Sequence, residues 1–256
     1  MKLRTRILKI VAGIAALSIV ALLLMVYAAF HGDPISALLA TRDIRAYAAL
    51  TYSGMPLAVQ SARYNFKFGS YMALADLPGS EDTHFAITWE HGEIVYDSYE
   101  TDVLGGFNTF ARVTRAMEEE MERLASTEYP HRIELLIVSM GENKEDFSML
   151  ELDMAPNLYD PPMPLSLTIW LEEEPGYTYR TAADRLIELK ALTDKRGIPV
   201  EMFSLSIREL SAEGEKPNYE SMLYAYDISS EMIKDEDALA ERIEQKQRGM
   251  DAQEKE

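Results

Sequence analysis

The sequence predicts an α+β protein tethered by an N-terminal transmembrane helix. Three observations lead to this fold class. Residues 10–30 carry no charged side chain. Several short stretches after residue 60 alternate apolar and polar residues, as strands do. Between them, apolar residues recur every three or four positions, as in amphipathic helices. We expect two such units after the transmembrane helix, at residues 31–130 and 131–248.

The uncharged stretch from Ile10 to Phe30 is long enough to cross a bilayer. Its 21 residues span about 30 Å at roughly 1.5 Å per residue in a helix. Residues 1–9, which precede it, are basic and include no acidic residue. Basic flanks of this kind stay in the cytoplasm, so we expect the bulk of the chain outside. The basic residues are Lys2, Arg4, Arg6 and Lys9.

A cleaved signal peptide is the alternative, with Val26 and Ala28 as the small residues of its cleavage site. The hydrophobic region of a signal peptide runs for only about 7–15 residues, so the length of this stretch favours a retained signal anchor. We therefore expect a single-pass protein of the cell membrane, with its N-terminus in the cytoplasm, that contacts the lipid bilayer through residues 10–30.

The first unit, residues 31–130, is predicted to contain a helix, a four-stranded antiparallel meander and a second helix. Asp33 followed by Pro34 is typical of a helix start, and this helix should end near residue 50. Apolar positions within residues 107–124 recur at helical spacing, so we expect an amphipathic helix lying on the meander. The four strands are predicted at residues 62–66, 71–75, 85–89 and 94–96.

The second unit, residues 131–248, is predicted to be a sheet with two helices, with a ferredoxin-like arrangement as one candidate topology. Residues 147–152 are a further strand candidate within a proline-rich stretch. The other strands are predicted at residues 133–138, 165–171, 203–207 and 219–228, and the helices at residues 178–195 and 230–247. Residues 249–256 form a polar tail that we expect to be disordered.

Composition excludes several classes of function. The chain has a net charge of −18, and because residues 1–9 carry four positive charges, the rest carries −22. Such an acidic ectodomain repels nucleic-acid phosphates and anionic lipid headgroups, so we expect neither as its partner. Cysteine is absent, which excludes disulfides, thiol nucleophiles and thiolate metal sites. The domain must therefore rest on its hydrophobic core.

Four short segments resemble a known family. They are His31-Gly-Asp-Pro-Ile35, Tyr64-Asn-Phe-Lys67, Asp82-Thr-His-Phe85 and Tyr96-Asp-Ser-Tyr-Glu100. Together they resemble the YfjL-like proteins of Bacillus and its relatives, which are small single-pass proteins without an assigned biochemical function. The resemblance covers about residues 1–125 well. It implies a Gram-positive, Bacillus-like host and an ectodomain that faces the cell wall, and it carries over no site residues.

No catalytic motif stands out in the chain. It contains no glycine-rich phosphate loop, no His-Glu-x-x-His pair for zinc and no Gly-x-Ser-x-Gly elbow. We therefore expect no catalytic, metal-binding or cofactor-binding residues and no cofactor. The leading hypothesis is a membrane-anchored extracytoplasmic binding module for a protein or cell-wall partner. The alternatives are a cell-envelope hydrolase with an unidentified carboxylate pair and an accessory subunit of a membrane assembly.

The loop from Met149 to Pro164 is the best candidate for a partner contact. It is long, apolar and stiffened by proline, and loops of that kind are often functional. Its large apolar side chains are Met154, Leu158, Tyr159 and Met163. The alternative is that they fold back over the core of the second unit. Tyrosines on the predicted strands, such as Tyr224 and Tyr226, fit both an interaction surface and ordinary strand propensity.

Overall fold

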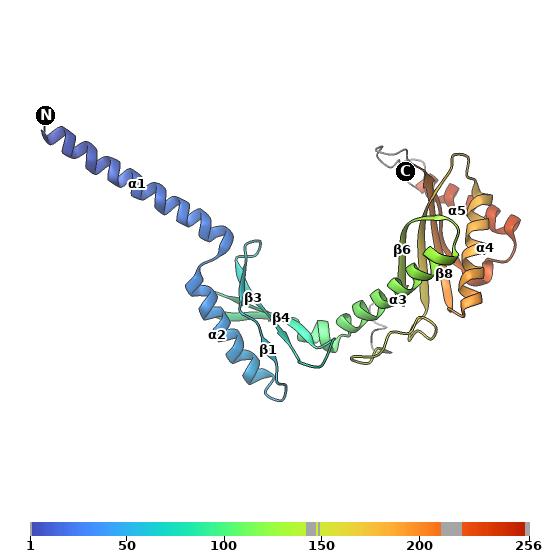
Figure 1. Ribbon diagram of the computed structural model, residues 1–256, viewed down its shortest axis with the longest axis horizontal. Coiled ribbons are helices and arrows are strands. Elements are labelled where there is room, and N and C mark those ends of the chain that lie inside the picture. Colours follow the sequence, from blue (N-terminus) through green and yellow to red (C-terminus); the bar gives the residue numbers. More distant parts are fainter. Residues whose placement is uncertain (1, 142–146, 148, 211–221, 254–256) are drawn as a thin grey trace. The chain divides into compact units, whose positions relative to one another are not determined.

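The computed structural model describes residues 2–141, 147, 149–210 and 222–253. It confirms the α+β fold class, with a long apolar helix followed by two sheets and their helices. The chain divides into two compact units, residues 1–108 and 109–256, and Figure 1 labels the elements of each. Each unit has a sheet of its own and a separate hydrophobic core.

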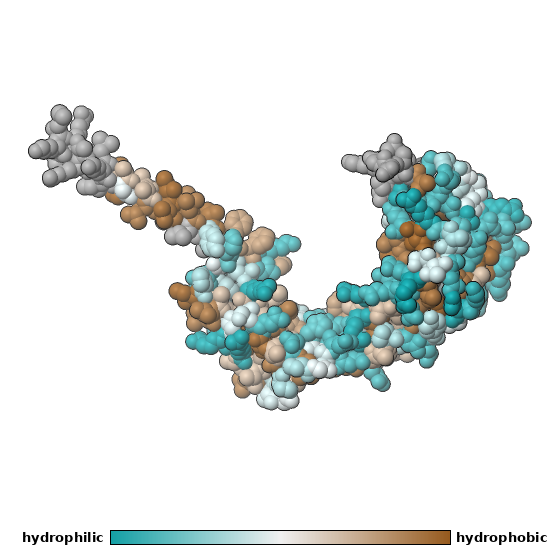
Figure 2. All heavy atoms as spheres, in the orientation of Figure 1, coloured by the Kyte–Doolittle hydropathy of each residue, from teal (hydrophilic) through white to brown (hydrophobic). Residues whose placement is uncertain are grey.

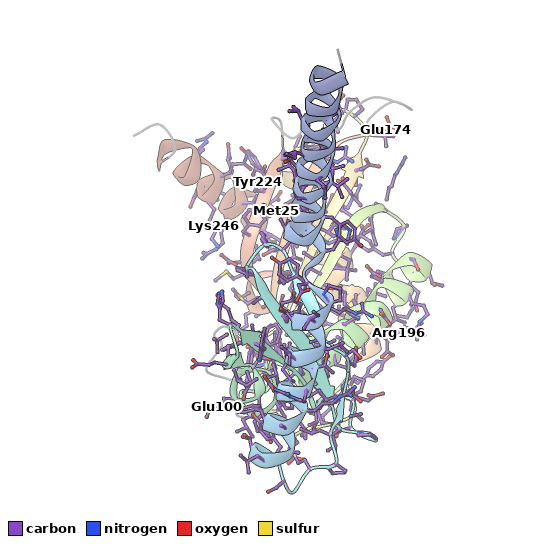
Figure 3. All side chains as sticks on the ribbon, turned by 90° about the vertical axis from the view of Figure 1, so that its left-hand side faces the viewer. Met25, Glu100, Glu174, Arg196, Tyr224 and Lys246 are labelled. Atoms are coloured by element: carbon purple, nitrogen blue, oxygen red, sulfur yellow. The ribbon has the colours of Figure 1, made fainter. Side chains whose placement is uncertain are left out.

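The first helix, α1 (Lys2–His31), is long and apolar enough to span a membrane. The described side chains of its apolar stretch are exposed, and they form the brown rod of Figure 2. Met25, for example, is 68 % exposed and points away from the helix (Figure 3). These properties make α1 a candidate membrane span by length and composition.

The second helix, α2 (Pro34–Thr51), begins as the sequence predicts. Asp33 is its N-cap, and the Asp33 carboxylate accepts a hydrogen bond from the Ser36 backbone N–H at 2.7 Å. The Ser36 hydroxyl also donates to this carboxylate, at 2.8 Å, and the two hydrogen bonds lower the pKa of Asp33. Gly32 separates α1 from α2 with φ +74°, a conformation that favours glycine.

The first sheet is antiparallel and includes the predicted four-stranded meander: β2 (Arg63–Asn65), β3 (Ser70–Asp76), β4 (His84–Glu90) and β5 (Glu93–Asp97). A short strand that the sequence did not reveal, β1 (Ala58–Val59), pairs with the end of β3. The core lies between α2 and the sheet, where Ala40, Ile44 and Ala48 share a cluster with Phe85 and Ile87. A π-helical turn, η1 (Tyr99–Leu104), follows β5.

Helix α3 (Phe107–Glu128) confirms the predicted helix but corrects its expected place. We expected it to lie on the first sheet and the units to divide at residue 130. Instead, the unit boundary falls at residue 108, and the buried side chains of α3 belong to the core of the second unit. They are Val113, Met117, Met121 and Ala125. Helix α2 already covers the first sheet, whereas the second sheet has a broad aliphatic face to receive α3.

The second unit contains α3, β6 (Arg132–Met140), β7 (Leu165–Glu173), α4 (Tyr179–Arg196), β8 (Val200–Glu209), β9 (Leu223–Ser229), the short helix η3 (Ser230–Met232) and α5 (Glu236–Gln253). The strand order is β6-β7-β8-β9, and only the central pair, β7 and β8, is parallel. Parallel neighbours need a crossover, which α4 provides. This succession differs from the β-α-β-β-α-β order of the ferredoxin-like arrangement.

Two local expectations for the second unit differ from the structure. No strand forms in the described part of residues 147–152, where Phe147 instead stacks on Phe110 with ring centroids 4.5 Å apart. The expected disorder of residues 249–256 is wrong for residues 249–253, because α5 continues to Gln253. Residues 254–256, and residues 219–221 of the predicted last strand, lie outside the described residues.

Candidate functional site: the open face of the second sheet

The second sheet buries one face under helices. Leu136, Ile169, Leu205 and Ala225 form a continuous buried row across the four strands. Figure 1 shows α4 and α5 on one side of the strands. Helix α3 joins the same layer, because its last residue, Glu128, pairs with Lys195 and Arg196 at the end of α4. In the described residues no helix covers the opposite face, which we call the open face.

The open face carries large apolar side chains among small hydroxyl residues. Its side chains alternate along the strands with those of the buried row: Leu135 and Ile137 on β6, Thr168 and Trp170 on β7, Ser204 and Ser206 on β8, and Tyr224 and Tyr226 on β9. Ser206, at the centre of this face, is itself buried. Leu135 and Ile137 are each 38 % exposed, and Trp170, Tyr224 and Tyr226 are half-buried. Brown side chains are visible over β6 in Figure 2. A sheet face that merely contacted water would be polar.

Contacts within the open face hold its two tyrosine side chains in place. Trp170 and Tyr224 flank Ser206 in one cross-strand row. The Ser206 hydroxyl donates a hydrogen bond to the Tyr226 hydroxyl at 3.1 Å, and the rings of Tyr224 and Tyr226 are 5.2 Å apart. The two tyrosine side chains are therefore held in place, which reduces the entropy that a partner must remove on binding.

A buried ion cluster borders the open face. The side chain of Arg208 is only 4 % exposed, and it pairs with Glu172 and, at 2.5 Å, with Glu134. Arg132 pairs with Glu172 at 2.6 Å. Arg208 of β8 thus joins Glu134 of β6 to Glu172 of β7. Removing it would leave these partly buried carboxylates without this counterion and would weaken the pairing of the three strands at this end.

Both edges of the second sheet are occupied by side chains from helices. At the β6 edge, the Glu118 carboxylate of α3 accepts a hydrogen bond from the Val138 N–H at 3.0 Å. At the β9 edge, Gln247 accepts from the Tyr224 N–H at 3.0 Å, and Lys246 donates to the Tyr226 carbonyl at 2.9 Å. Figure 3 labels Lys246 and Tyr224 on these neighbouring elements. A partner that adds a strand would have to displace these groups, so the open face is the more accessible surface.

The predicted contact loop, Met149–Pro164, lies partly inside the core. Leu158 and Met163 are 1 % and 3 % exposed and belong to the core of the second unit. Met154 is half-buried against the same cluster. These three side chains are therefore held within the chain in this conformation, because aliphatic side chains gain more from core packing than from water. Tyr159 is the exposed one, at 45 %.

Of the four predicted contact residues, Tyr159 is the one whose side chain makes a hydrogen bond within the described residues. Its hydroxyl donates to the Glu120 carboxylate of α3 at 3.1 Å, and this bond raises the pKa of Tyr159. A contact through the loop remains a prediction, and Tyr159 is the residue that would make it.

One pair of carboxylates has the electrostatic character of an acid–base pair. Burial and the neighbouring Glu236 raise the pKa of Asp184. Arg180, however, already pairs with Glu236 and, at 3.2 Å, with Asp237. None of the cavities described below is lined by Asp184, so the pair favours a contact between α4 and α5 over a hydrolytic site. No group of three potential ligands for a metal ion occurs within the described residues.

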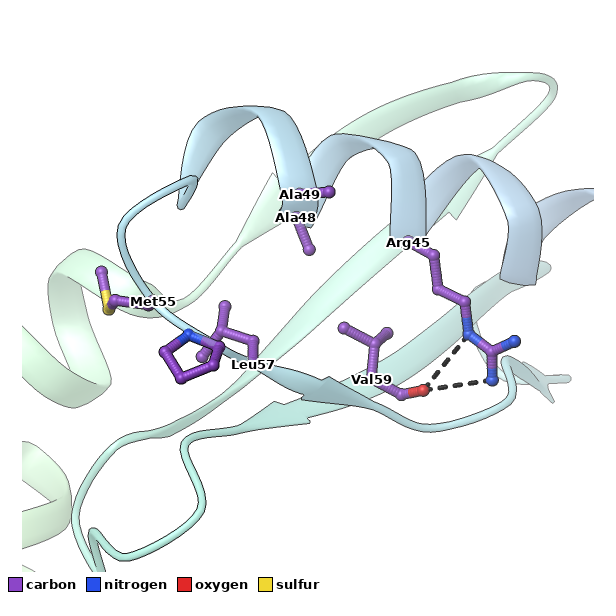
Figure 4. Close-up of a pocket in the computed structure, with 7 residues that line it drawn as sticks. Arg45, Ala48, Ala49, Met55, Leu57 and Val59 are labelled. Atoms are coloured by element: carbon purple, nitrogen blue, oxygen red, sulfur yellow. Dashed lines mark hydrogen bonds between the residues drawn. The ribbon is translucent and has the colours of Figure 1, made fainter.

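The cavities of the described residues are small. One in the first unit, shown in Figure 4, has a volume of about 310 Å³ and is lined by Arg45, Ala48, Ala49, Met55, Pro56, Leu57 and Val59. The Arg45 guanidinium donates to the Val59 carbonyl at 3.2 and 3.3 Å. It therefore connects α2 to β1. Another, of about 360 Å³, lies in the second unit and is lined by Tyr177, Thr178, Tyr179, Met222, Leu223 and Gln247. Neither gathers the side chains of a catalytic site.

Sequence reasoning missed the open face although two signals for it were present. The apolar run 133–138 continues through positions that face both sides of β6, which is typical of a strand covered on both faces. In β7, Ser166, Thr168 and Trp170 alternate with leucines and isoleucine. A tryptophan in a row of small polar residues indicates a face that is not ordinary solvent-exposed surface.

Comparison with known proteins agrees with the two-unit structure. Residues 7–98 match the YfjL-like N-terminal domain, and residues 116–244 match the YfjL-like C-terminal domain. No curated protein and no solved structure matches the chain. The C-terminal match extends the resemblance well beyond residue 125 and begins within α3, in agreement with the assignment of this helix to the second unit. The chain belongs to the YfjL-like family.

Proposed function

We propose that this protein is a membrane-anchored binding module without catalytic activity. Helix α1 serves as a signal anchor, with the basic residues 1–9 in the cytoplasm and both units outside. The support for this topology is the length and apolarity of α1 and the positive charge that precedes it. Protease added to intact protoplasts is expected to remove the two units. Their complete protection would contradict the topology.

The open face is the proposed binding surface, and the observation that carries the proposal is the exposure of Leu135 and Ile137 beside Trp170. Exposed aliphatic side chains next to a half-buried tryptophan fit a protein partner, since apolar area and aromatic anchors dominate protein interfaces. A glycan would be expected to stack on aromatic rings among polar groups, and it would gain little from Leu135 and Ile137. A protein of the membrane or cell wall is therefore the favoured partner.

Site-specific photo-crosslinking in intact cells tests this proposal. A benzophenone amino acid replaces Ile137 on the open face and, as the matched control, Met232, which is similarly exposed at 40 % but lies outside the open face. We expect one discrete protein adduct from position 137 and none from position 232. Equal adducts from both positions would overturn the proposed surface.

A second variant distinguishes specific binding from proximity. Trp170→Ala removes the central anchor of the open face, and at an interface the loss of a buried tryptophan typically weakens binding by about 2 kcal/mol or more. We expect the adduct from position 137 to decrease several-fold in this variant while the protein still melts cooperatively. If sedimentation with purified peptidoglycan were lost instead of the protein adduct, the partner would be a cell-wall glycan.

A further inference from the structure

The hairpin that joins β2 to β3 exposes two phenylalanines at its tip. Phe66 is 63 % exposed and Phe68 is 72 % exposed, with the exposed Lys67 between them. Turns are usually built from glycine, proline, asparagine, aspartate and serine. A tip with the sequence Phe-Lys-Phe-Gly therefore places apolar area in a position where local structure does not require it. We call residues 66–68 the aromatic tip.

Hydrogen bonds fix the conformation of the aromatic tip. The Asn65 carbonyl accepts from the N–H groups of Phe68 and Gly69 at 3.2 and 2.9 Å, and the Asn65 side chain accepts from the Lys67 N–H at 3.2 Å. Gly69 has φ +69°, which returns the chain to β3 without strain. The two rings are therefore presented by an ordered turn.

The aromatic tip lies beside the end of the apolar helix α1. The rings of Phe66 and Phe30 are 6.1 Å apart, and Figure 1 shows the hairpin next to the last turn of α1. The base of the hairpin is bound to the start of α2, because the Tyr71 hydroxyl accepts from the Asp33 N–H at 2.6 Å and donates to the Asp33 carbonyl at 3.0 Å. The tip is thus fixed at the level where α1 would leave a bilayer.

The charge of the hairpin also suits a membrane surface. Between residues 31 and 108 the chain has ten acidic residues and only four lysines and arginines, and two of those four, Arg63 and Lys67, belong to this hairpin. No acidic residue occurs from Ile44 to Ala75. A lysine between two apolar rings can extend its ammonium group to lipid phosphates while the rings enter the acyl region.

We propose that the aromatic tip inserts into the interface of the same bilayer that α1 spans, and so forms a second membrane contact that holds the first unit against the lipid surface. The proposal rests on the membrane anchoring of α1 given under Proposed function. Phenyl rings gain free energy on leaving water for the lipid interface, and continuity with α1 identifies lipid as the occupant.

Depth measurement with spin labels tests the aromatic tip directly. The chain has no cysteine, so single substitutions give unique labels in the full-length protein, reconstituted in vesicles of phosphatidylcholine and phosphatidylglycerol. The positions are Lys67→Cys at the tip, Val20→Cys in α1 and Leu50→Cys at the far end of α2, where the native side chain is 81 % exposed. We expect the ratio of oxygen to nickel-chelate accessibility to be several-fold higher at positions 20 and 67 than at position 50.

Each outcome has a distinct meaning. If the ratio of oxygen to nickel-chelate accessibility is high at position 20 but as low at position 67 as at position 50, the tip does not insert, whereas α1 is still anchored in the membrane. If position 20 is accessible to the nickel chelate, the anchor and the tip both fail. Shielding of position 67 from both reagents would identify a protein contact and overturn lipid as the occupant. In the variant Phe66→Ser/Phe68→Ser, the ratio of oxygen to nickel-chelate accessibility is expected to fall at position 67 and to stay high at position 20.

Discussion

Thirty buried residues of the described chain form the core of the second unit, whereas eleven form that of the first. The second core is built mainly of leucine, isoleucine and valine between three helices and a sheet. Five of the eleven residues in the first core are alanines: Ala40, Ala48, Ala62, Ala73 and Ala75. Alanine buries little area, so hydrophobic burial contributes less per residue to the stability of the first unit than to that of the second.

Polar contacts of aromatic side chains compensate for the thin core of the first unit. The Trp89 indole N–H donates to the Asp43 carboxylate at 3.1 Å. The Asp97 carboxylate accepts from the hydroxyls of Tyr47 and, at 2.9 Å, Tyr52. The first unit should thus depend on individual hydrogen bonds, and the second on close packing. The comparison indicates that the small unit is specified largely by individual polar contacts, and the larger unit by the volume of its apolar core.

Core truncations should give the largest effects, and each should affect only its own unit. Phe85 and Phe203 are 1 % and 0 % exposed, and Phe→Ala at such a site costs about 3–5 kcal/mol. We expect Phe203→Ala to destabilise the second unit, which should remain folded. Phe85→Ala should unfold the first unit, because its smaller core has less stability to lose.

The two tryptophans make this comparison measurable, because one lies in each unit. In a Trp170→Phe background, the fluorescence of Trp89 reports the unfolding of the first unit. In a Trp89→Phe background, the fluorescence of Trp170 reports the unfolding of the second unit. Denaturant titration of both backgrounds gives the two free energies of unfolding. If Phe85→Ala lowered the stability reported by Trp170 as strongly as that reported by Trp89, the units would not be independent.

A smaller effect is expected at the junction of α1 and the first unit. A Cβ atom added at Gly32 would lie 2.5 Å from Cγ of Tyr64 and 2.8 Å from the Tyr71 hydroxyl, and φ is +74° there. Gly32→Ala should cost about 1–3 kcal/mol in the first unit, from strain and from the displaced tyrosines. Gly54→Ala is the control, since a Cβ there has no neighbour within 4 Å. Equal stability of the two variants in the Trp89 assay would show that the junction is not a structural constraint.

The smallest effect concerns alkaline pH. Burial, followed by the hydrogen bond to Asp97, raises the pKa of Tyr52 above the value of 10 for a free tyrosine. Because the folded state holds this proton more tightly, the stabilisation is fully present below pH 10 and is lost as the pH rises beyond it. Tyr52→Phe should therefore reduce the loss of stability of the first unit between neutral pH and about pH 11. Tyr96→Phe, which removes an exposed tyrosine, should leave that loss unchanged.

The features predictable from the sequence were those that local chemistry decides. The N-cap Asp33 and the end of α4 at Gly197, where φ is +71°, depend on neighbours within a few residues. The sheet that α3 covers could not be predicted, because amphipathic spacing shows which side chains are buried but not the surface that buries them. The parallel pairing of β7 and β8 is likewise a long-range property.

The candidate site was predictable only in part. The loop side chains Leu158 and Met163 are as apolar as an interface residue would be, and nothing local distinguishes an interface from a core. The open face combines residues from four strands that are far apart in the sequence. Its individual members, such as Tyr224 and Tyr226, were visible as strand residues, but their common face depends on strand order and register.

The two tryptophans also provide the most direct test of the central claim, that partner binding belongs to the open face of the second unit. The protein captured by crosslinking at position 137 is titrated into the Trp89→Phe variant, which reports Trp170 alone, and into the unsubstituted chain, whose additional emission comes from Trp89. We predict a blue shift of Trp170 emission, because the partner excludes water from the open face, and no change in the emission of Trp89, which is 7 % exposed in the first unit. A response of Trp89 with Trp170 unchanged would contradict the account and place the binding surface in the first unit.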